Sequence, residues 1–402
     1  MSETGDIRID DIMPHLPNQW ITLPFEECLD KRKIKFKKLK KKNIKSKGTY
    51  PVIDQGENFI SGYVDSESDL YGGPLPVIIF GDHTRRIKFV DFQFAVGADG
   101  TKILNPLQEF HPKFFYYYLR ALNLASQGYS RHYRFLKAID VPKPSSNEQN
   151  RIVAKLERLL AKVEACKERL NKIPTLLKRF RQSVLAAACT GRLTADWREK
   201  HHYNRDDWPT VKFFDFCILQ RGYDLPLSQS INGPYPIVTS AGVVAYHSKF
   251  KVQRPGVVTG RSGSIGKVHF VQEDFWPHNT TLFVKDFKGN EPKYVYYFLL
   301  YFDTRQFSAS TAVPTLNRNN LRDTFVEVPP LDEQHEIVRR VEALFKIADQ
   351  IEERYMKAKA YIDKLTQSIL AKAFRGELVP QDPNDEPVPV LLKRIRHEGE
   401  KR

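Results

Sequence analysis

Residues 176–194 read LLKRFRQSVLAAACTGRLT, and residues 361–379 read YIDKLTQSILAKAFRGELV. The two stretches lie 185 residues apart, and the match extends without a gap over 141–194 and 326–379, with 18 identities in 54 pairs. Self-similarity at a fixed separation indicates an internal repeat. The chain is therefore a duplication, and this repeat decides its fold.

A looser similarity continues upstream of the ungapped repeat. The separation drifts there, which small insertions explain. The aligned pairs are Trp20 with Trp208, Tyr50 with Tyr235, and Pro112-Lys113 with Pro292-Lys293. The plan is A-B-A'-B', in which the A segments vary and the B segments are uniform.

The B segments are predicted to be long helices. Apolar residues recur at alternating spacings of four and three, which is a heptad seam. In the first copy they are Ile152, Leu156, Leu159, Val163, Cys166, Leu170, Ile173 and Leu177, and in the second Ile337, Val341, Leu344, Ala348, Ile351, Tyr355 and Ile362. Helices on two separate cores would show the same stripe, but two matched seams favour mutual pairing. Pro174 predicts a kink or an interruption in the first helix, because proline lacks an N–H.

The A segments read as β-rich globules. Short apolar runs at 77–80 and 257–259, and the β-branched stretch 235–246, predict strands. Residues 116–122 and 296–301 are predicted to be short buried helices. We expect an α+β fold in which two α/β domains are separated by two long helices that pair as an antiparallel coiled coil. The expected boundaries are 1–145, 146–190 for the first helix region, 191–330, 331–375 for the second, and 376–402 for a tail.

The charge indicates an anionic partner. The net charge is +15 with a pI near 9.4, and residues 31–47 hold eleven Lys or Arg and no acid. A run of like charges is often a disordered tail. Here Ile34, Phe36 and Leu39 are interleaved with the lysines, and 33–37 alternates as a strand with one apolar face. This pattern favours a folded basic face that contacts phosphates.

Motifs for chemistry are missing from the sequence. Residues 260–268 lack the glycine spacing and hydroxyl of a phosphate loop. Asn105-Pro106 lacks the aromatic residue that a DNA amino-methyltransferase places around a flipped base. His201-His202 is interpreted as part of a solvated linker. The cysteines are predicted to be free thiols without a metal, namely Cys28, Cys166, Cys189 and Cys217. We expect a cytoplasmic chain with no catalytic residue, cofactor, metal site or membrane contact.

Candidate DNA contacts are basic and polar side chains on predicted loops. Arg and Asn are preferred, because they read guanine and adenine with two hydrogen bonds. The candidates are Lys33, Lys35, Lys37, Lys38, Lys40, Lys41, Lys42, Arg85, Arg86, Arg131, Arg134, Arg261, Ser262, Lys267, His278, Asn279, Arg318 and Asn319. Each of them could equally be a solvated surface group.

Residues 176–194 and 374–387 resemble the specificity subunits of type I restriction-modification enzymes, and the resemblance covers nearly the whole chain. It implies that each A segment is a target-recognition domain for one half of a bipartite, asymmetric double-stranded DNA target. It also implies that methyltransferase subunits, two of them, and restriction/translocase subunits dock on the chain. S-adenosylmethionine, ATP and Mg would then belong to those partners. The alternatives are a stand-alone duplicated DNA-binding module without enzyme partners and an enzyme with an unrecognised active site.

Overall fold

The computed structural model describes residues 16–32, 34–97, 100–122, 124, 131–226, 228, 230–309, 315–388 and 390. The chain forms two compact units. Unit 1 comprises Met1–Leu170 and Lys357–Arg402, and unit 2 comprises Asn171–Met356. Each unit therefore contains one globular part and one portion of each long helix. No described helix is both long enough and apolar enough to cross a membrane.

The globular part of unit 1 is built from small sheets and short helices. One sheet has the strand order β2–β7–β3–β4, a second has the order β6–β5–β8, and β1 pairs with β9. The bounds are β1 Ile21–Pro24, β2 Lys38–Leu39, β3 Tyr50–Ile53, β4 Gly62–Val64, β5 Val77–Gly81, β6 Ile87–Val90, β7 Ala95–Gly97, β8 Thr101–Leu104, β9 Asp140–Lys143, α1 Pro112–Ala121 and α2 Tyr133–Lys137. Strand β5 is buried along its whole length, as its continuous apolar run predicts.

Unit 2 repeats this plan. Its sheets have the orders β11–β17–β14–β15 and β13–β12–β16, and β10 pairs with β20 and β18 with β19. The bounds are β10 Thr210–Lys212, β11 Ile218–Arg221, β12 Tyr235–Thr239, β13 Gly242–His247, β14 Gly256–Gly260, β15 Val268–Val271, β16 Trp276–Pro277, β17 Thr281–Asp286, β18 Ser308–Ala309, β19 Thr315–Leu316, β20 Phe325–Glu327, α4 Ala195–Lys200, α5 Phe213–Phe216 and α6 Pro292–Tyr301. The predicted strands and short helices in both units are confirmed.

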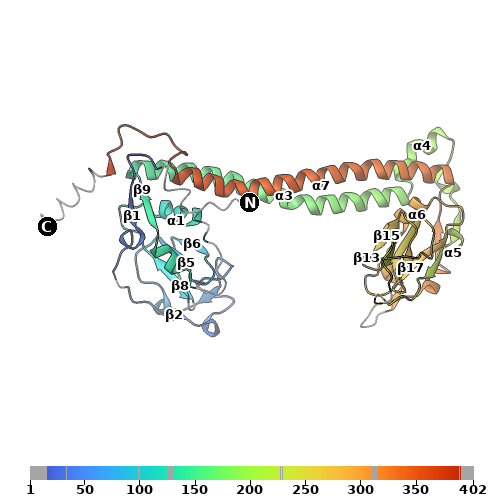
Figure 1. The fold of residues 1–402 in the computed structure, drawn as a ribbon, viewed down its shortest axis with the longest axis horizontal. Helices are drawn as coiled ribbons and strands as arrows, with labels where there is room; N and C mark the ends of the chain where they lie inside the picture. Colours follow the sequence, from blue (N-terminus) through green and yellow to red (C-terminus); the bar gives the residue numbers. More distant parts are fainter. Residues whose placement is uncertain are drawn as a thin grey trace. The chain divides into compact units, whose positions relative to one another are not determined.

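The B segments form two helices of 44 residues, α3 Ser146–Cys189 and α7 Leu331–Phe374. In unit 1 the C-terminal half of α7 packs beside the N-terminal half of α3, where Lys167 Nζ lies 4.0 Å from Asp363 Oδ1. In unit 2 Arg181 on α3 contacts Asp349 on α7 at 2.7 Å. The helices run antiparallel within each unit (Figure 1), so the α+β fold class with two long helices is confirmed.

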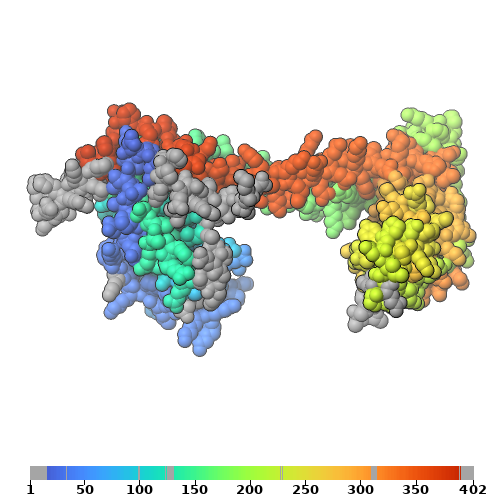
Figure 2. All heavy atoms as spheres, in the orientation of Figure 1, coloured from blue at the N-terminus to red at the C-terminus, as the bar shows by residue number. Residues whose placement is uncertain are grey.

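Each unit closes its own core around the end of a long helix. In unit 1 Leu156 and Val163 share a core with Ile369 and Phe374, and α7 packs on the globular part. The atoms of the N-terminal third of the chain and of the end of α7 lie against each other there (Figure 2). In unit 2 Leu185 shares a core with Val341 and the aromatic residues of α6.

Two expectations for the helices are wrong in part. Helix α3 continues through Pro174, so the predicted interruption is wrong, whereas the kink stays a prediction. The heptad pattern also placed Cys166 and Ile351 in the seam, but Cys166 is exposed and Ile351 is 42% exposed. A heptad seam indicates which side of a helix faces its partner. A side chain of the seam is buried only where the facing helix has a side chain large enough to cover it. The apolar positions near the helix ends are buried because the globular parts cover them as well.

Candidate nucleic-acid interface

The lysine-rich tract is folded where the structure describes it. Leu39 is 1% exposed, and Ile34 and Phe36 pack against the cluster around Tyr71 and Phe94. The strand expected over 33–37 is wrong, because β2 contains only Lys38–Leu39 and pairs with two residues of β7. The alternation nevertheless holds in part, since Lys35 and Lys37 are exposed between the packed side chains. Lys33 lies outside the described residues.

The lysines of the tract differ in how they are engaged. Lys37 pairs with Asp69 at 2.8 Å, and Lys38 Nζ donates to the Thr101 carbonyl oxygen at 3.0 Å. Lys40, Lys41 and Lys42 are exposed around a short 3-10 turn. Within the described part of the chain, no ion pair involves these three lysines or Lys35. Those four ammonium groups are therefore available to an anion.

The arginine candidates of unit 1 occupy two places. Arg85 and Arg86 line a cavity of about 510 Å³ together with Arg120. The Arg85 guanidinium donates to the Leu124 carbonyl oxygen at 2.5 Å, and Arg86 pairs with Glu57 at 2.9 Å. Arg131 and Arg134 are exposed beside and on α2, where Arg134 stacks over the Phe135 ring at 4.8 Å.

In unit 2 the fold brings three candidate turns together. The backbone N–H groups of Arg261 and Ser262 both donate to the Thr280 carbonyl oxygen, at 2.9 and 3.1 Å. Arg261 Nη1 also donates to the Asn279 carbonyl oxygen at 2.9 Å, and the Arg261 carbonyl accepts from the Leu316 N–H at 2.8 Å. The turns at 261–262, 278–280 and 315–318 thus form one surface.

The other unit 2 candidates lie around this surface or apart from it. Arg318 Nη1 donates to the Leu219 carbonyl oxygen at 3.1 Å, and Asn319 is exposed next to it. Both ring nitrogens of His278 are engaged, with the Leu225 carbonyl at 3.2 Å and Thr280 Oγ1 at 3.3 Å. His278 therefore holds the turn in place. Lys267 is exposed at the end of the turn between β14 and β15.

A cavity of about 720 Å³ opens beside these turns, and sequence reasoning missed most of its lining. Arg221 lines it from the end of β11, and Tyr223 and Asp224 line it from the residues that follow. Arg261 and Arg318 line it from the turns at 261–262 and 315–318. The Asp224 carboxylate accepts from Arg221 Nη2 at 3.0 Å and from the Asn279 side-chain amide. Gly222 gave a signal that was not used, because a glycine between polar residues often marks close backbone approach.

The start of each long helix is anchored by a repeated glutamate. Glu148 on α3 accepts from Trp20 Nε1 at 2.9 Å and from the Gln381 amide at 2.5 Å. In the second copy Glu333 on α7 accepts from Trp208 Nε1 at 2.8 Å. Both glutamates are buried. The repeat showed these pairs as identities, but only the fold shows what they bind.

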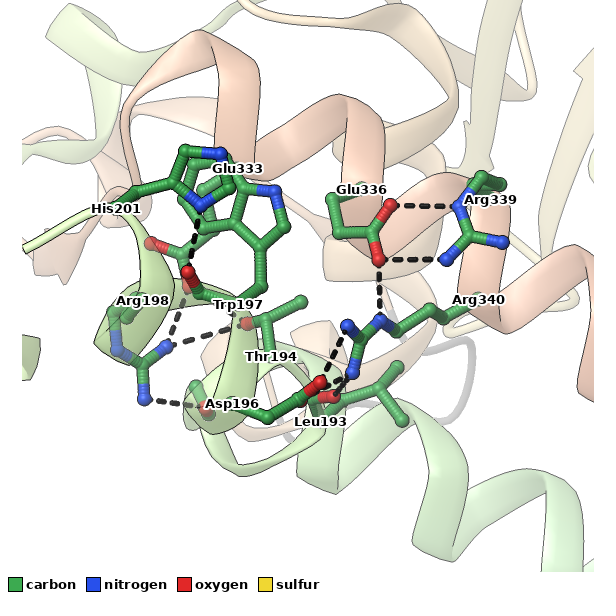
Figure 3. A network of polar contacts seen from close by, with 11 residues as sticks. Leu193, Thr194, Asp196, Trp197, Arg198, His201, Glu333, Glu336, Arg339 and Arg340 are labelled. Carbon is green, nitrogen blue, oxygen red and sulfur yellow. Dashed lines mark hydrogen bonds and ion pairs between the residues drawn. The ribbon is translucent and has the colours of Figure 1, made fainter. Parts of the chain in front are cut away.

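Glu333 has additional donors that Glu148 lacks. Arg198 Nη1 lies 2.5 Å from Glu333 Oε1, and Thr194 Oγ1 donates to the same oxygen at 2.7 Å. Figure 3 shows this network together with the neighbouring pair of Arg340 and Asp196. His201 stacks on Trp197 in the same region, so the stretch before β10 is a packed helix end with exposed histidines.

The glutamine that follows each glutamate joins the long helix to the globular part. Gln149 Oε1 accepts from the backbone N–H of His111, at 2.6 Å, and Gln334 Oε1 accepts from that of Glu291, at 2.9 Å. His111 and Glu291 are the N-caps of α1 and α6. The same Glu-Gln pair therefore fixes each globular part to its helix.

The described residues offer little for chemistry. No group of three His, Cys, Asp or Glu side chains among them could hold a metal ion. All four cysteines are free thiols, as predicted. Burial raises the pKa of Cys28 to about 12, so its thiol is not a nucleophile at neutral pH.

The profile of the type I restriction modification DNA specificity domain matches this sequence twice, over residues 20–175 and 205–358. The two matches include most of both units. The chain belongs to the type I restriction modification DNA specificity family.

Named relatives agree with this assignment. The EcoBI specificity subunit of Escherichia coli is 33% identical over 68% of this chain and 67% of its own length. The StySPI specificity subunit of Salmonella potsdam is 33% identical over 60% of this chain and 58% of its own length. This specificity subunit is non-catalytic, as the sequence predicted.

Solved structures share the fold at low identity. The HsdS subunit from Thermoanaerobacter tengcongensis has a TM-score of 0.58 at 18% identity, covering 91% of this chain and 99% of that one. A chain from a study of complex assembly and conformational transition of the type I R-M system has a TM-score of 0.63 at 16% identity, covering 90% of this chain and 99% of that one. These likenesses extend over both units of the specificity subunit.

Proposed function

We propose that this specificity subunit binds a bipartite, asymmetric double-stranded DNA target, with the globular part of each unit reading one half-site. The observation that carries the proposal is that the two units share one fold but expose different candidate DNA-binding side chains. Unit 1 carries the lysine tract, and unit 2 carries the surface around Arg261. A symmetric target would call for matching readers, and these units differ.

Type I methyltransferase subunits, two per chain, and restriction/translocase subunits supply the chemistry in this proposal. S-adenosylmethionine, ATP and Mg bind to those partners. The family assignment supports this part of the proposal. The target-recognition domains are 1–145 and 191–330, and the helix regions are 146–190 and 331–375.

The test exchanges one target-recognition domain for that of a relative, in cells that also express the methyltransferase subunit. Methylated motifs are then mapped across genomic DNA. We expect the unaltered chain to direct methylation of one bipartite motif, and each exchange to change one half-site only. A change in both half-sites would refute reading by separate domains, and methylation by this chain without its partners would point to an unrecognised active site.

We further propose that the helices set the gap between half-sites. The structure tells where an insertion must go, because Lys167 and Asp363 face each other in unit 1. Four residues added after Lys167 and four added before Asp363 keep the facing pairs on each side of the insert. They shift the heptad phase across it and so cost some stability, and seven residues at each place serve as the in-register control. Four residues lengthen a helix by roughly 6 Å, which corresponds to one or two base pairs.

The expected motif keeps both half-sites and gains one or two unspecified base pairs between them. Inserting four residues in α3 alone is the control, since it breaks the pairing without lengthening both helices. An active double insertion with the original gap would show that the helices do not measure distance.

A further inference from the structure

Each globular part contains a cavity that is lined by an Arg–Asp ion pair from one short segment. In unit 2 the cavity is lined by residues 220–224, by Leu282 of β17 and by the turn at 315–318. In unit 1 a cavity of about 410 Å³ is lined by 29–32, by Ile103 of β8 and by Tyr133 of α2. The ion pairs are Arg32 with Asp30 in unit 1 and Arg221 with Asp224 in unit 2.

The two cavities expose opposite hydrogen-bonding groups. In unit 1 the Asp30 side chain is 15% exposed, and it holds Arg32, which is 75% exposed, through an ion pair of 2.5 Å. In unit 2 the order is reversed, since the Asp224 side chain is 69% exposed and Arg221 is 51% exposed. Unit 1 presents a donor to solvent, whereas unit 2 presents an acceptor beside donors.

The two residues before Asp224 are held in place by backbone hydrogen bonds. Gly222 N–H donates to the Thr281 carbonyl at 3.0 Å, and Tyr223 N–H donates to the Pro277 carbonyl at 2.8 Å. A Cβ on Gly222 would lie 2.1 Å from the His278 carbonyl oxygen, so only glycine permits this approach. The Asn279 amide then fixes the carboxylate. A group ordered before binding loses little entropy when it meets a ligand.

The chemistry of the cavity favours base edges over phosphate. Arg221, Arg261 and Arg318 alone would suit either a phosphate or guanine. A carboxylate among them repels phosphate, but it accepts a hydrogen bond from the exocyclic amino group of cytosine or adenine. The hydrogen bond from Asn279 lowers the pKa of Asp224, which keeps the group ionised and able to accept at neutral pH.

We propose that Asp224 is a specificity-determining residue of unit 2, and that its carboxylate accepts a hydrogen bond from the exocyclic amino group of a base in the half-site. Arg221 and Arg318 stand beside it as donors to neighbouring acceptors. This inference rests on the proposed function, because it needs unit 2 to read DNA. It assigns the reading to the cavity between the segment after β11 and the turn at 315–318.

The test uses the chain assembled with its methyltransferase subunit and duplexes that carry the mapped target. Single base pairs of each half-site are varied, and binding is measured at several salt concentrations. In Asp224→Asn the oxygen that accepts from the Asn279 amide stays an acceptor, and the other carboxylate oxygen is replaced by an amino donor that cannot accept from a base. We therefore expect discrimination at one base pair of one half-site to fall by roughly 5- to 150-fold, the range for losing one contact that reads a base. The other half-site and the salt dependence should stay unchanged.

Asp286→Asn is the matched control, because Asp286 is an exposed aspartate of unit 2 that hydrogen-bonds Lys288 N–H and does not line the cavity. Asp224→Glu retains the charge and moves it by one methylene, so it should alter preference at the same base pair. It also serves as the test variant if thermal unfolding shows that Asp224→Asn is misfolded.

Two results would overturn the inference. Unchanged discrimination in a folded Asp224 variant would remove the residue from base reading. Uniform weakening for all sequences would give it a structural role only. If the unaltered complex methylated no bipartite motif, the proposed function itself would fail, and this outcome is read before any variant is compared.

Discussion

In each unit an equivalent glutamate at the start of a long helix accepts hydrogen bonds, but the donors differ between the units. Glu148 in unit 1 is held by neutral donors, the Trp20 indole and the Gln381 amide. Glu333 in unit 2 has the Trp208 indole and, in addition, the Arg198 guanidinium. A duplicated contact can thus keep its tryptophan donor while the charge around the glutamate changes.

The largest effect should follow from breaking the charged version of the anchor. Arg198→Ala leaves the buried Glu333 carboxylate without its cation, which typically costs about 3–5 kcal/mol. The free energy of opening is measured by hydrogen exchange at the first turns of α7. Arg339→Ala is the control, since Arg339 is 68% exposed and pairs with Glu336 on the same helix, and pairs of an exposed arginine contribute little. Equal losses of opening free energy in both variants would contradict the distinction between a buried and an exposed ion pair.

The lysine tract distinguishes the units in DNA binding. Replacing Lys40, Lys41 and Lys42 by Ala should weaken binding to all sequences and reduce the salt slope by about 0.9 for each phosphate that is no longer neutralised. For three lysines the slope would change by up to about 3. Lys37→Ala and Lys45→Ala are the controls, because these lysines pair with Asp69 and Asp65. An unchanged slope in the triple variant would remove the tract from the interface.

Substituting the two tryptophans compares the contacts of Glu148 and Glu333 directly. Trp20→Phe and Trp208→Phe each remove one donor to a buried carboxylate, at a cost of about 1–3 kcal/mol. The loss should be larger for Trp20, because Glu148 keeps one other side-chain donor whereas Glu333 keeps Arg198 and Thr194. Hydrogen exchange at the starts of α3 and α7 measures both. A larger loss for Trp208 would reverse the ranking of the anchors.

The smallest effect should be a dependence on pH in unit 1. Burial is the main cause that raises the pKa of Glu148 above its ordinary 4.5. An acid with a raised pKa in the folded state contributes stability below the unfolded pKa and loses it as the pH rises through the folded pKa.

The thermal stability of the unaltered chain is always compared with that of Glu148→Gln. This comparison is needed because Arg151 lowers the pKa of the nearby Asp385, which makes stability change with pH in the opposite direction. The thermal midpoint of the unaltered chain minus that of the variant should decline as the pH rises from about 4 to 7. A difference that grows with pH would contradict the sign.

Much of the fold could be predicted from the repeat, because helices and buried strands leave periodic patterns. The heptad seams correspond to α3 and α7, and the apolar runs at 77–80 and 257–259 correspond to β5 and β14. The site was less predictable. Arg261, Asn279 and Arg318 were predicted from residue type and a loop position, and their common surface arises from turns far apart in the sequence. Arg221 and Asp224 were missed because polar residues at and after the end of a strand look like any solvated turn.

The duplication, the two long helices and the family can be recognised without a structure, since each leaves a local or repeated pattern of residues. The folded structure establishes which residues are in contact. It placed Lys167 opposite Asp363, gave Glu333 an arginine that Glu148 lacks, and exposed Asp224 where the other unit exposes Arg32. These contacts join residues distant in the chain, and their energies depend on burial and on the particular neighbours, which no periodic pattern carries.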